Sequence, residues 1–172
     1  MGVPRGTLFK YVGMAEELRI AKGSKQDKYA TLYEQILSVL ENEPDHIARM
    51  ANIAAMIHAT FNHWWTGFYR VMDDELVLGP FQGPLACTRI GFGKGVCGSA
   101  WRDASTIIVD DVEQFPGHIA CSSLSRSEIV VPVFDQGVIV AVLDIDSCYL
   151  ATFDHTDQEW LERIAALIHI KK

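Results

Sequence analysis

Three of the four cysteines fall in the middle of the chain, close to glycines and turn-forming residues. Cys87, Cys97 and Cys121 are separated by ten and twenty-four residues, and Cys148 follows further along. The segment around Cys121 contains His118 and several small residues. A thiol in such a loop is open to a substrate atom, and a neighbouring imidazole can favour the reactive thiolate. The pattern therefore favours thiol chemistry centred on Cys121.

These residues could also have a structural role instead of a catalytic one. Free cysteine is among the most buried residue types, so each thiol could simply fill the core, and His118 could be a solvated loop residue. A zinc site could be built from His118, Cys121, Cys87 and Cys97, but only His118 and Cys121 have the spacing of a ligand pair. Structural zinc sites usually contain paired C-x₂₋₄-C knuckles, and none occurs in the sequence. We expect no metal.

Acidic residues interrupt two apolar segments that have the pattern of β-strands. Alternation along 140–146 places Asp144 and Asp146 on one face of a strand, and Leu143 with its odd-numbered neighbours on the other. Glu128 interrupts the apolar segment 127–134 in the same way. Neighbouring carboxylates repel unless water, a cation or a proton is shared, and crowding raises at least one pKa. These acids are candidates for binding a charged substrate, with solvent exposure at a strand end as the alternative.

An aromatic group could form the apolar side of such a site. Trp65 and Tyr69 share one face of a predicted strand, and Gly67 leaves a gap between them. Aromatic rings contact thioether and methyl groups favourably, so the pair could bind a sulfur-containing substrate. Packing in the core is the alternative.

The segment 93–98 matches G-x-G-x-x-G, with Glu113 downstream. A dinucleotide fingerprint should follow a buried parallel strand and open a helix in a βαβ unit, whereas this segment lies within an antiparallel pattern. We expect a flexible loop that carries Cys97, and no cofactor.

The elements that must position these residues form an α+β pattern. Residues 1–23 are a loose extension with a short helix around 14–20, and residues 24–172 form one domain. Ser24 caps a first helix that ends near Asn42, and a second helix begins at Pro44. About six strands in a mostly antiparallel sheet follow, with hairpin turns at 73–74 and 135–137. A last helix starts at Thr156, where Thr156 and Glu159 have capping-box form, and the terminal helices cover one face of the sheet.

Composition excludes several classes of partner. The chain has 172 residues, of which 49% are hydrophobic and 22% charged, and a net charge of -7. An acidic chain without a basic cluster is a poor ligand for nucleic acid or an anionic membrane. No apolar run has membrane-spanning length and no signal peptide is evident, so we expect a cytoplasmic protein whose thiols are kept reduced.

Several short motifs, taken in order, resemble the free methionine-(R)-sulfoxide reductases, which are single GAF domains. The resemblance covers about residues 25–170 and rests on these segments: 67–69 (GFY), 78–83 (LGPFQG), 95–98 (GVCG), 117–121 (GHIAC), 127–130 (SEIV) and 143–147 (LDIDS). It implies a GAF fold, a homodimer, and free methionine (R)-sulfoxide as substrate.

The resemblance also implies roles for individual residues. Cys121 would be the nucleophile, Cys87 the resolving thiol that closes an intramolecular disulfide, and Cys97 an auxiliary or alternative resolver. The substrate would be bound by acids and aromatic rings: Glu128, Asp144, Asp146, Trp65 and Tyr69. A thioredoxin-like dithiol protein would reopen the disulfide. The alternatives are a GAF sensor that binds a small ligand and a redox switch without turnover.

Overall fold

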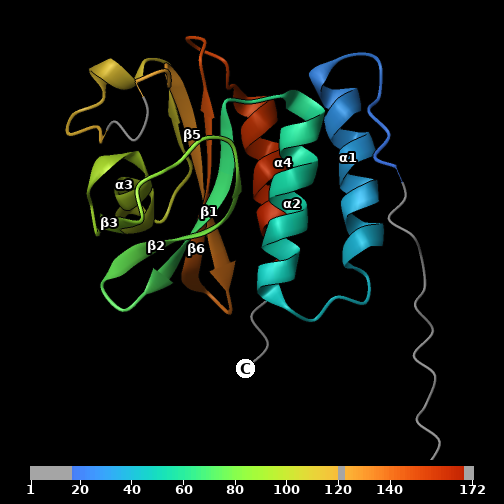
Figure 1. Cartoon of the computed structure of the whole chain (residues 1–172), viewed down its shortest axis with the longest axis horizontal. Coiled ribbons are helices and arrows are strands. Elements are labelled where there is room, and N and C mark those ends of the chain that lie inside the picture. The colour runs from blue at the N-terminus through green and yellow to red at the C-terminus, as the bar shows by residue number, and fades with distance from the viewer. Residues whose placement is uncertain (1–16, 120–122, 169–172) are drawn as a thin grey trace, which may run out of the picture.

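The computed structural model describes residues 17–119 and 123–168, which form a six-stranded sheet with helices on both faces (Figure 1). The elements in chain order are α1 (Lys25–Leu40), α2 (His46–Phe61), β1 (Trp65–Met72), β2 (Glu75–Gln82), β3 (Arg89–Gly91), α3 (Gly95–Asp103), β4 (Ile107–Val109), the 3₁₀ turn η1 (Val112–Gln114), β5 (Ser127–Asp135), β6 (Val138–Ser147) and α4 (His155–Ala165). The α+β class and the mostly antiparallel six-stranded sheet expected from the sequence are confirmed.

The strand order is β3-β2-β1-β6-β5-β4, and every neighbouring pair is antiparallel. Two tight hairpins produce most of this order. Asp73 turns β1 into β2 with φ of 54°, and Gln136 and Gly137 turn β5 into β6 with φ of 50° and 81°. Consecutive positive φ values match the right-handed twist of the flanking strands. Pairing of β1 with β6 then joins the two hairpins into one sheet.

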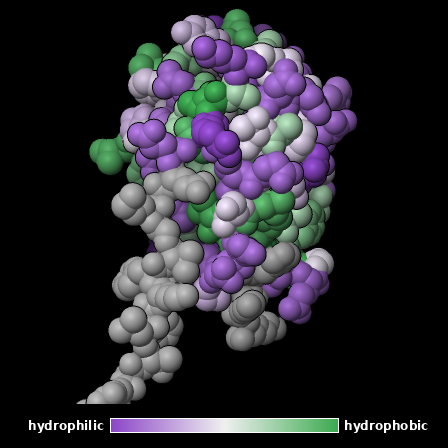
Figure 2. All heavy atoms as spheres, turned by 90° about the vertical axis from the view of Figure 1, so that its right-hand side faces the viewer, coloured by the Kyte–Doolittle hydropathy of each residue, from purple (hydrophilic) through white to green (hydrophobic). Residues whose placement is uncertain are grey.

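The terminal helices cover one face of the sheet, as the sequence predicts. Helices α2 and α4 lie against the strands and α1 packs on their outer side (Figure 1). The core between these layers contains apolar residues at alternate strand positions, including Phe68, Ile129, Leu143 and Ile145. The outer face on the side of α1 is mostly polar with apolar patches between the polar residues (Figure 2). Leu37 on this helix is among the exposed large hydrophobic residues. No helix of the described ranges is long and apolar enough to cross a membrane.

The largest error of the sequence prediction is on the opposite face, where Cys97 lies in a helix and not in a flexible loop. Helix α3 runs from Gly95 to Asp103, and its residues up to Ala100 are buried. Glycine lowers helix propensity, and nine residues are too few to show a helical period. Packing against the sheet stabilises a helix that local preference does not predict.

Other element boundaries differ by one or two residues because different side chains cap the helices. Asp45 caps α2, so Pro44 lies just outside the helix. Asp154 caps α4 and Asp157 completes the capping box, in place of the predicted Thr156 and Glu159. The described part of the predicted short helix, 17–20, has no regular secondary structure, and 14–16 lie outside the described residues.

Candidate active site

The sheet register brings the predicted acids together on the face that α3 covers. Asp146 on β6 lies opposite Trp65 on β1 and opposite Glu128 on β5. Asp144, two residues earlier, lies opposite Gly67. Because side chains alternate along a strand, all of these residues project to the same side. The alternation predicted for Asp144 and Asp146 is confirmed; Asp144 is buried, and Asp146, one residue before the end of β6, is half-buried.

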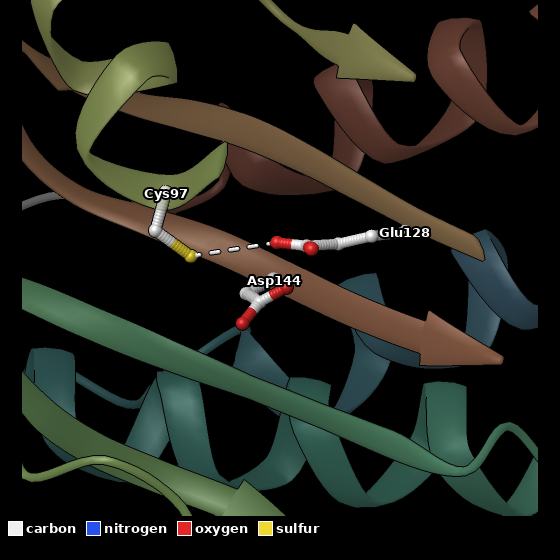
Figure 3. Close-up of side chains that lie close together, drawn as sticks. All are labelled: Cys97, Glu128 and Asp144. Atoms are coloured by element: carbon white, nitrogen blue, oxygen red, sulfur yellow. Dashed lines mark hydrogen bonds between the residues drawn. The ribbon is translucent and has the colours of Figure 1, made fainter. Parts of the chain in front are cut away.

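Cys97, Glu128 and Asp144 form a buried cluster drawn from three elements (Figure 3). The thiol of Cys97 donates a hydrogen bond to Oε1 of Glu128 over 3.9 Å. One sulfur or oxygen atom from each of the three residues lies within 4.8 Å of the others. Asp144 is only 6% exposed, and its Oδ1 has no hydrogen-bond partner among the described residues. A buried polar atom without a partner is costly, which suggests that a ligand satisfies it.

Burial and mutual repulsion shift the acids of this cluster toward their protonated forms. Burial raises the pKa of Glu128 well above its usual range, and the negative charges of Asp144 and Asp146 raise it further. Burial and the charge of Asp146 do the same to the pKa of Asp144. Burial raises the pKa of Asp146 to about 6, against a hydrogen bond from Ser125 that lowers it. The cluster can therefore hold and release protons near neutral pH.

Burial also raises the pKa of the Cys97 thiol well above its usual range, and the charge of Asp144 adds to the effect. A thiol that stays protonated is a weak nucleophile. Its surroundings suit Cys97 to hydrogen bonding within the cluster better than to attack on a substrate.

Glycines fix the position of α3, and with it the position of Cys97. A Cβ atom on Gly98 would lie 2.5 Å from the carbonyl oxygen of Gly91, so only glycine permits this approach. The backbone N–H of Gly93 also donates to the carbonyl of Gly98 over 2.9 Å. The glycine pattern of 93–98 thus serves the packing of a short helix on β3, which is not what a dinucleotide-binding loop does.

The aromatic wall is present, but its construction differs from the prediction. Trp65 stacks between Tyr69 and Phe81, with ring centroids 5.8 and 5.4 Å away. A Cβ atom on Gly67 would lie 2.5 Å from the indole of Trp65. The space at Gly67 is therefore filled by that indole and is not a slot for a substrate group. Trp65 and Tyr69 are both buried but line the cavity, so only the parts of their rings that face it can contact a ligand.

Sequence reasoning missed the link between this wall and Cys87. The hydroxyl of Tyr69 donates to the backbone carbonyl of Cys87 over 3.0 Å, and Nε1 of Trp65 donates to the carbonyl of Pro84 over 3.2 Å. The two rings therefore hold the segment between β2 and β3 in place. The sequence contains only a weak signal of these two hydrogen bonds, because Trp65 and Tyr69 lie eighteen or more residues before Cys87.

These groups line one cavity. The acids Glu128, Asp144 and Asp146 lie on its sheet side and α3 contributes Cys97; loop residues complete the wall, namely Pro84, Leu85, Ala86, Lys94, His118 and Ile119. His118 is half-buried, and burial lowers the pKa of its imidazole. His118 thus lines the cavity while part of its surface stays in contact with solvent, and its role beside Cys121 stays a prediction.

The cysteines have three different environments. Cys87 is disulfide-bonded, whereas Cys97 and Cys148 are free, the first buried and the second exposed. Cys121, the predicted nucleophile, lies outside the described residues. Ile119, the last described residue before it, lines the cavity.

Residues 47–170 match a family model described as "GAF domain". A curated protein of Dictyostelium discoideum, "GAF domain-containing protein A", is 54% identical over 156 residues, which are 90% of this chain and 99% of that protein. The "Free methionine-R-sulfoxide reductase" of Escherichia coli (strain K12) is 40% identical over 144 residues, 83% of this chain and 87% of the relative.

A solved structure gives the same result in three dimensions. The free methionine-R-sulfoxide reductase of Neisseria meningitidis, determined in complex with its substrate, superposes with a TM-score of 0.86 at 52% identity. The match covers 88% of this chain and 92% of that one.

Proposed function

Because the chain belongs to the GAF domain family, among its free methionine-(R)-sulfoxide reductases, we propose that it reduces free L-methionine (R)-S-oxide to L-methionine with Cys121 as nucleophile. The observation that carries the proposal is the buried acidic cavity. Three carboxylates lie beside an aromatic wall, and Oδ1 of Asp144 has no partner among the described residues. Free methionine sulfoxide complements both walls: its ammonium group can pair with the carboxylates, and its methyl group can contact the aromatic rings.

The first chemical step is attack by the Cys121 thiolate on the sulfoxide sulfur. The attack joins the two sulfur atoms. This sulfur–sulfur bond and the sulfur–oxygen bond of the substrate then break, the oxygen passes to Cys121, which becomes a sulfenic acid, and the substrate leaves as methionine, reduced by the two electrons that Cys121 supplies. The departing oxygen needs a proton. Glu128 and Asp144, whose pKa values are raised by burial, can deliver one directly or through water.

The second step closes a disulfide. The Cys87 thiol attacks the Cys121 sulfenic acid, forms the disulfide and releases water. The disulfide-bonded state of Cys87, with Cys97 and Cys148 free, supports Cys87 as the resolving thiol and leaves Cys97 as an alternative resolver. A thioredoxin-like dithiol protein then reopens the bond by thiol–disulfide exchange. We place this cycle in the cytosol, where such donors keep thiols reduced, and in a homodimer.

The acids also explain a preference for the free amino acid. Glu128, Asp144 and Asp146 offer charge-assisted hydrogen bonds to an ammonium group, whereas a peptide nitrogen carries no charge. Buried carboxylates that face an uncharged amide would stay uncompensated, which is costly. Methionine sulfoxide within a protein chain is therefore a poor substrate.

A turnover assay coupled to a dithiol donor tests the proposal. The R epimer of free methionine sulfoxide should be consumed, and both the S epimer and the N-acetylated R epimer should react poorly. Cys121→Ser should abolish turnover, because a hydroxyl is not an anionic nucleophile near neutral pH. Cys148→Ser, at the exposed free thiol, is the matched control and should leave the rate unchanged.

The same assay separates the resolving thiols. Cys87→Ser should give about one methionine per subunit and then stall with a sulfenic acid on Cys121, visible as a dimedone adduct by mass spectrometry. Sustained turnover of Cys87→Ser would assign resolution to Cys97. Binding of the sulfoxide without consumption would identify a sensor instead of an enzyme, and oxidation of thiols without methionine release would identify a redox switch.

A further inference from the structure

The three side chains in Figure 3 have the donor set of a metal site as well as that of a substrate pocket. Cys97 contributes sulfur, and Glu128 and Asp144 each contribute a carboxylate oxygen. Zinc combines sulfur and oxygen ligands and commonly takes three protein ligands, with a fourth position left for water. We propose that Cys97, Glu128 and Asp144 bind a Zn²⁺ ion in the substrate-free cavity, and that this ion excludes the substrate.

The distances are close to those that zinc requires. With zinc–sulfur and zinc–oxygen bonds of about 2.3 and 2.1 Å at a tetrahedral angle, the sulfur and oxygen ligands lie roughly 3.6 Å apart. The Cys97 sulfur lies 3.9 Å from Oε1 of Glu128. The three donor atoms all lie within 4.8 Å of one another, so small side-chain rotations complete the site without movement of the backbone.

A second observation points to a ligand at the same place. Oδ1 of Asp144 has no hydrogen-bond partner among the described residues, although its side chain is more than nine-tenths buried. The cavity also contains more negative than positive groups. Among the described residues that line it, Lys94 is the only lysine or arginine, and its side chain is exposed. A divalent cation satisfies the free oxygen and balances the buried acids in one step.

The donor set selects against the common hard cations. Magnesium prefers six oxygen ligands including several waters, and calcium takes six to eight oxygens at longer distances. A thiolate is a soft ligand that zinc accepts and that both hard cations avoid, so the sulfur of Cys97 favours zinc over either ion. Zinc is the expected occupant, and magnesium serves as the negative control.

Regulation of the enzyme follows if the ion and the substrate share Asp144, and this part rests on the proposed function. Zinc bound at Cys97, Glu128 and Asp144 occupies the acids that would bind the ammonium group of the sulfoxide. The two ligands must then compete, so each lowers the apparent affinity of the other.

The experiment uses the full chain in its disulfide form, in which only Cys97 and Cys148 are free thiols. Calorimetric titration should show one Zn²⁺ per chain and no binding of Mg²⁺. Cys97→Ser and Glu128→Gln, both close to the native volume, should each weaken zinc binding at least tenfold. Cys148→Ser is the matched thiol control and should bind like the wild type. Circular dichroism and the thermal midpoint verify that each variant is folded.

Cobalt provides a spectroscopic readout that does not depend on activity. The Co²⁺ complex should show a thiolate-to-metal charge-transfer band that Cys97→Ser loses and Cys148→Ser keeps. No zinc binding, or binding lost in Cys148→Ser and retained in Cys97→Ser, would overturn the site. Free methionine (R)-sulfoxide should lower the apparent zinc affinity of the disulfide form, and an unchanged affinity would overturn the shared occupancy. The proposed function is tested separately, by turnover in the reduced, metal-free protein.

Discussion

Asp144 lowers the stability of the folded protein when no ligand is bound. Its carboxylate is 6% exposed, and burial and the charge of Asp146 hold its pKa well above the ordinary value. One oxygen lacks a partner among the described residues. The folded protein without ligand therefore maintains an unfavourable group, and the ligand relieves it. Affinity and stability should respond in opposite directions when this carboxylate is removed.

Asp144→Asn keeps the shape and removes the charge. We expect the affinity for free methionine (R)-sulfoxide to fall about ten- to hundredfold, because a charge-assisted hydrogen bond contributes roughly 1.5 to 3 kcal/mol. The thermal midpoint of the ligand-free protein should rise, by about 2–4 °C for each kcal/mol that burial of the ionisable carboxyl beside Asp146 costs the folded protein. Calorimetric binding and thermal unfolding measure the two effects. Asp74→Asn, in an exposed turn, should change neither; a destabilised Asp144→Asn would contradict the argument.

Tyr69 acts on the chemistry through the backbone of Cys87. Tyr69→Phe removes the hydroxyl that donates to the Cys87 carbonyl and leaves the ring stacked on Trp65. We expect the first turnover, one methionine per subunit, to keep its rate, and disulfide closure to slow severalfold because Cys87 is held less well. Rapid-quench kinetics separate the two steps. Equal slowing of both would show that the hydroxyl serves the substrate and not Cys87.

Helix α3 packs so closely on β3 that one added methyl group would displace it. A Cβ atom at Gly98 would lie 2.5 Å from the Gly91 carbonyl oxygen, so Gly98→Ala must displace the start of the helix that carries Cys97. We expect a loss of about 1–3 kcal/mol in the free energy of unfolding, as for other overpacked sites. Gly91→Ala, at the end of β3 and on the other side of the same contact, meets only the flexible Lys94 side chain at 3.4 Å and should cost much less. Denaturant unfolding of both variants provides the comparison, and equal costs would argue against the steric explanation.

The same element marks the limit of sequence prediction. Strands β5 and β6 were predictable because each is an apolar run of strand length and turn residues at 135–137 separate them, and the alternation over 143–146 places Asp144 and Asp146 on one face. Helix α3 is short, rich in glycine and stabilised by packing, so no local pattern indicates it. The hydrogen bond between Cys97 and Glu128 also depends on the position of α3. The two residues are thirty-one positions apart, so the sequence pattern does not predict their contact. The motif resemblance predicted a shared site but not this contact.

The two faces of the sheet have different roles: one carries most of the apolar core, and the other carries the candidate active site. The larger core lies between the sheet and the terminal helices, and the acids, Cys97 and the cavity lie on the other face. Changes in the helix layer should therefore alter stability while the cavity keeps its shape. His63 offers a test, because it lies between α2 and β1 and its ring packs near Phe61 and Phe153, at centroid distances of 5.5 and 5.2 Å.

Burial lowers the pKa of His63 to about 4, with smaller contributions from the charges of Lys25 and His58, and its Nε2 has no partner among the described residues. The unfolded chain takes up this proton near pH 6.5, whereas the folded protein resists it until about pH 4. The stability due to neutral His63 is thus fully present above pH 6.5 and is lost as the pH falls toward 4. The full difference corresponds to about 3 kcal/mol at most. His63→Phe should remove this part of the pH dependence, and His155→Gln, at an exposed histidine, should keep it. The free energy of unfolding, measured in denaturant at several pH values between 4 and 7, decides the matter: parallel curves for wild type and His63→Phe would show that His63 is protonated in the folded protein without cost.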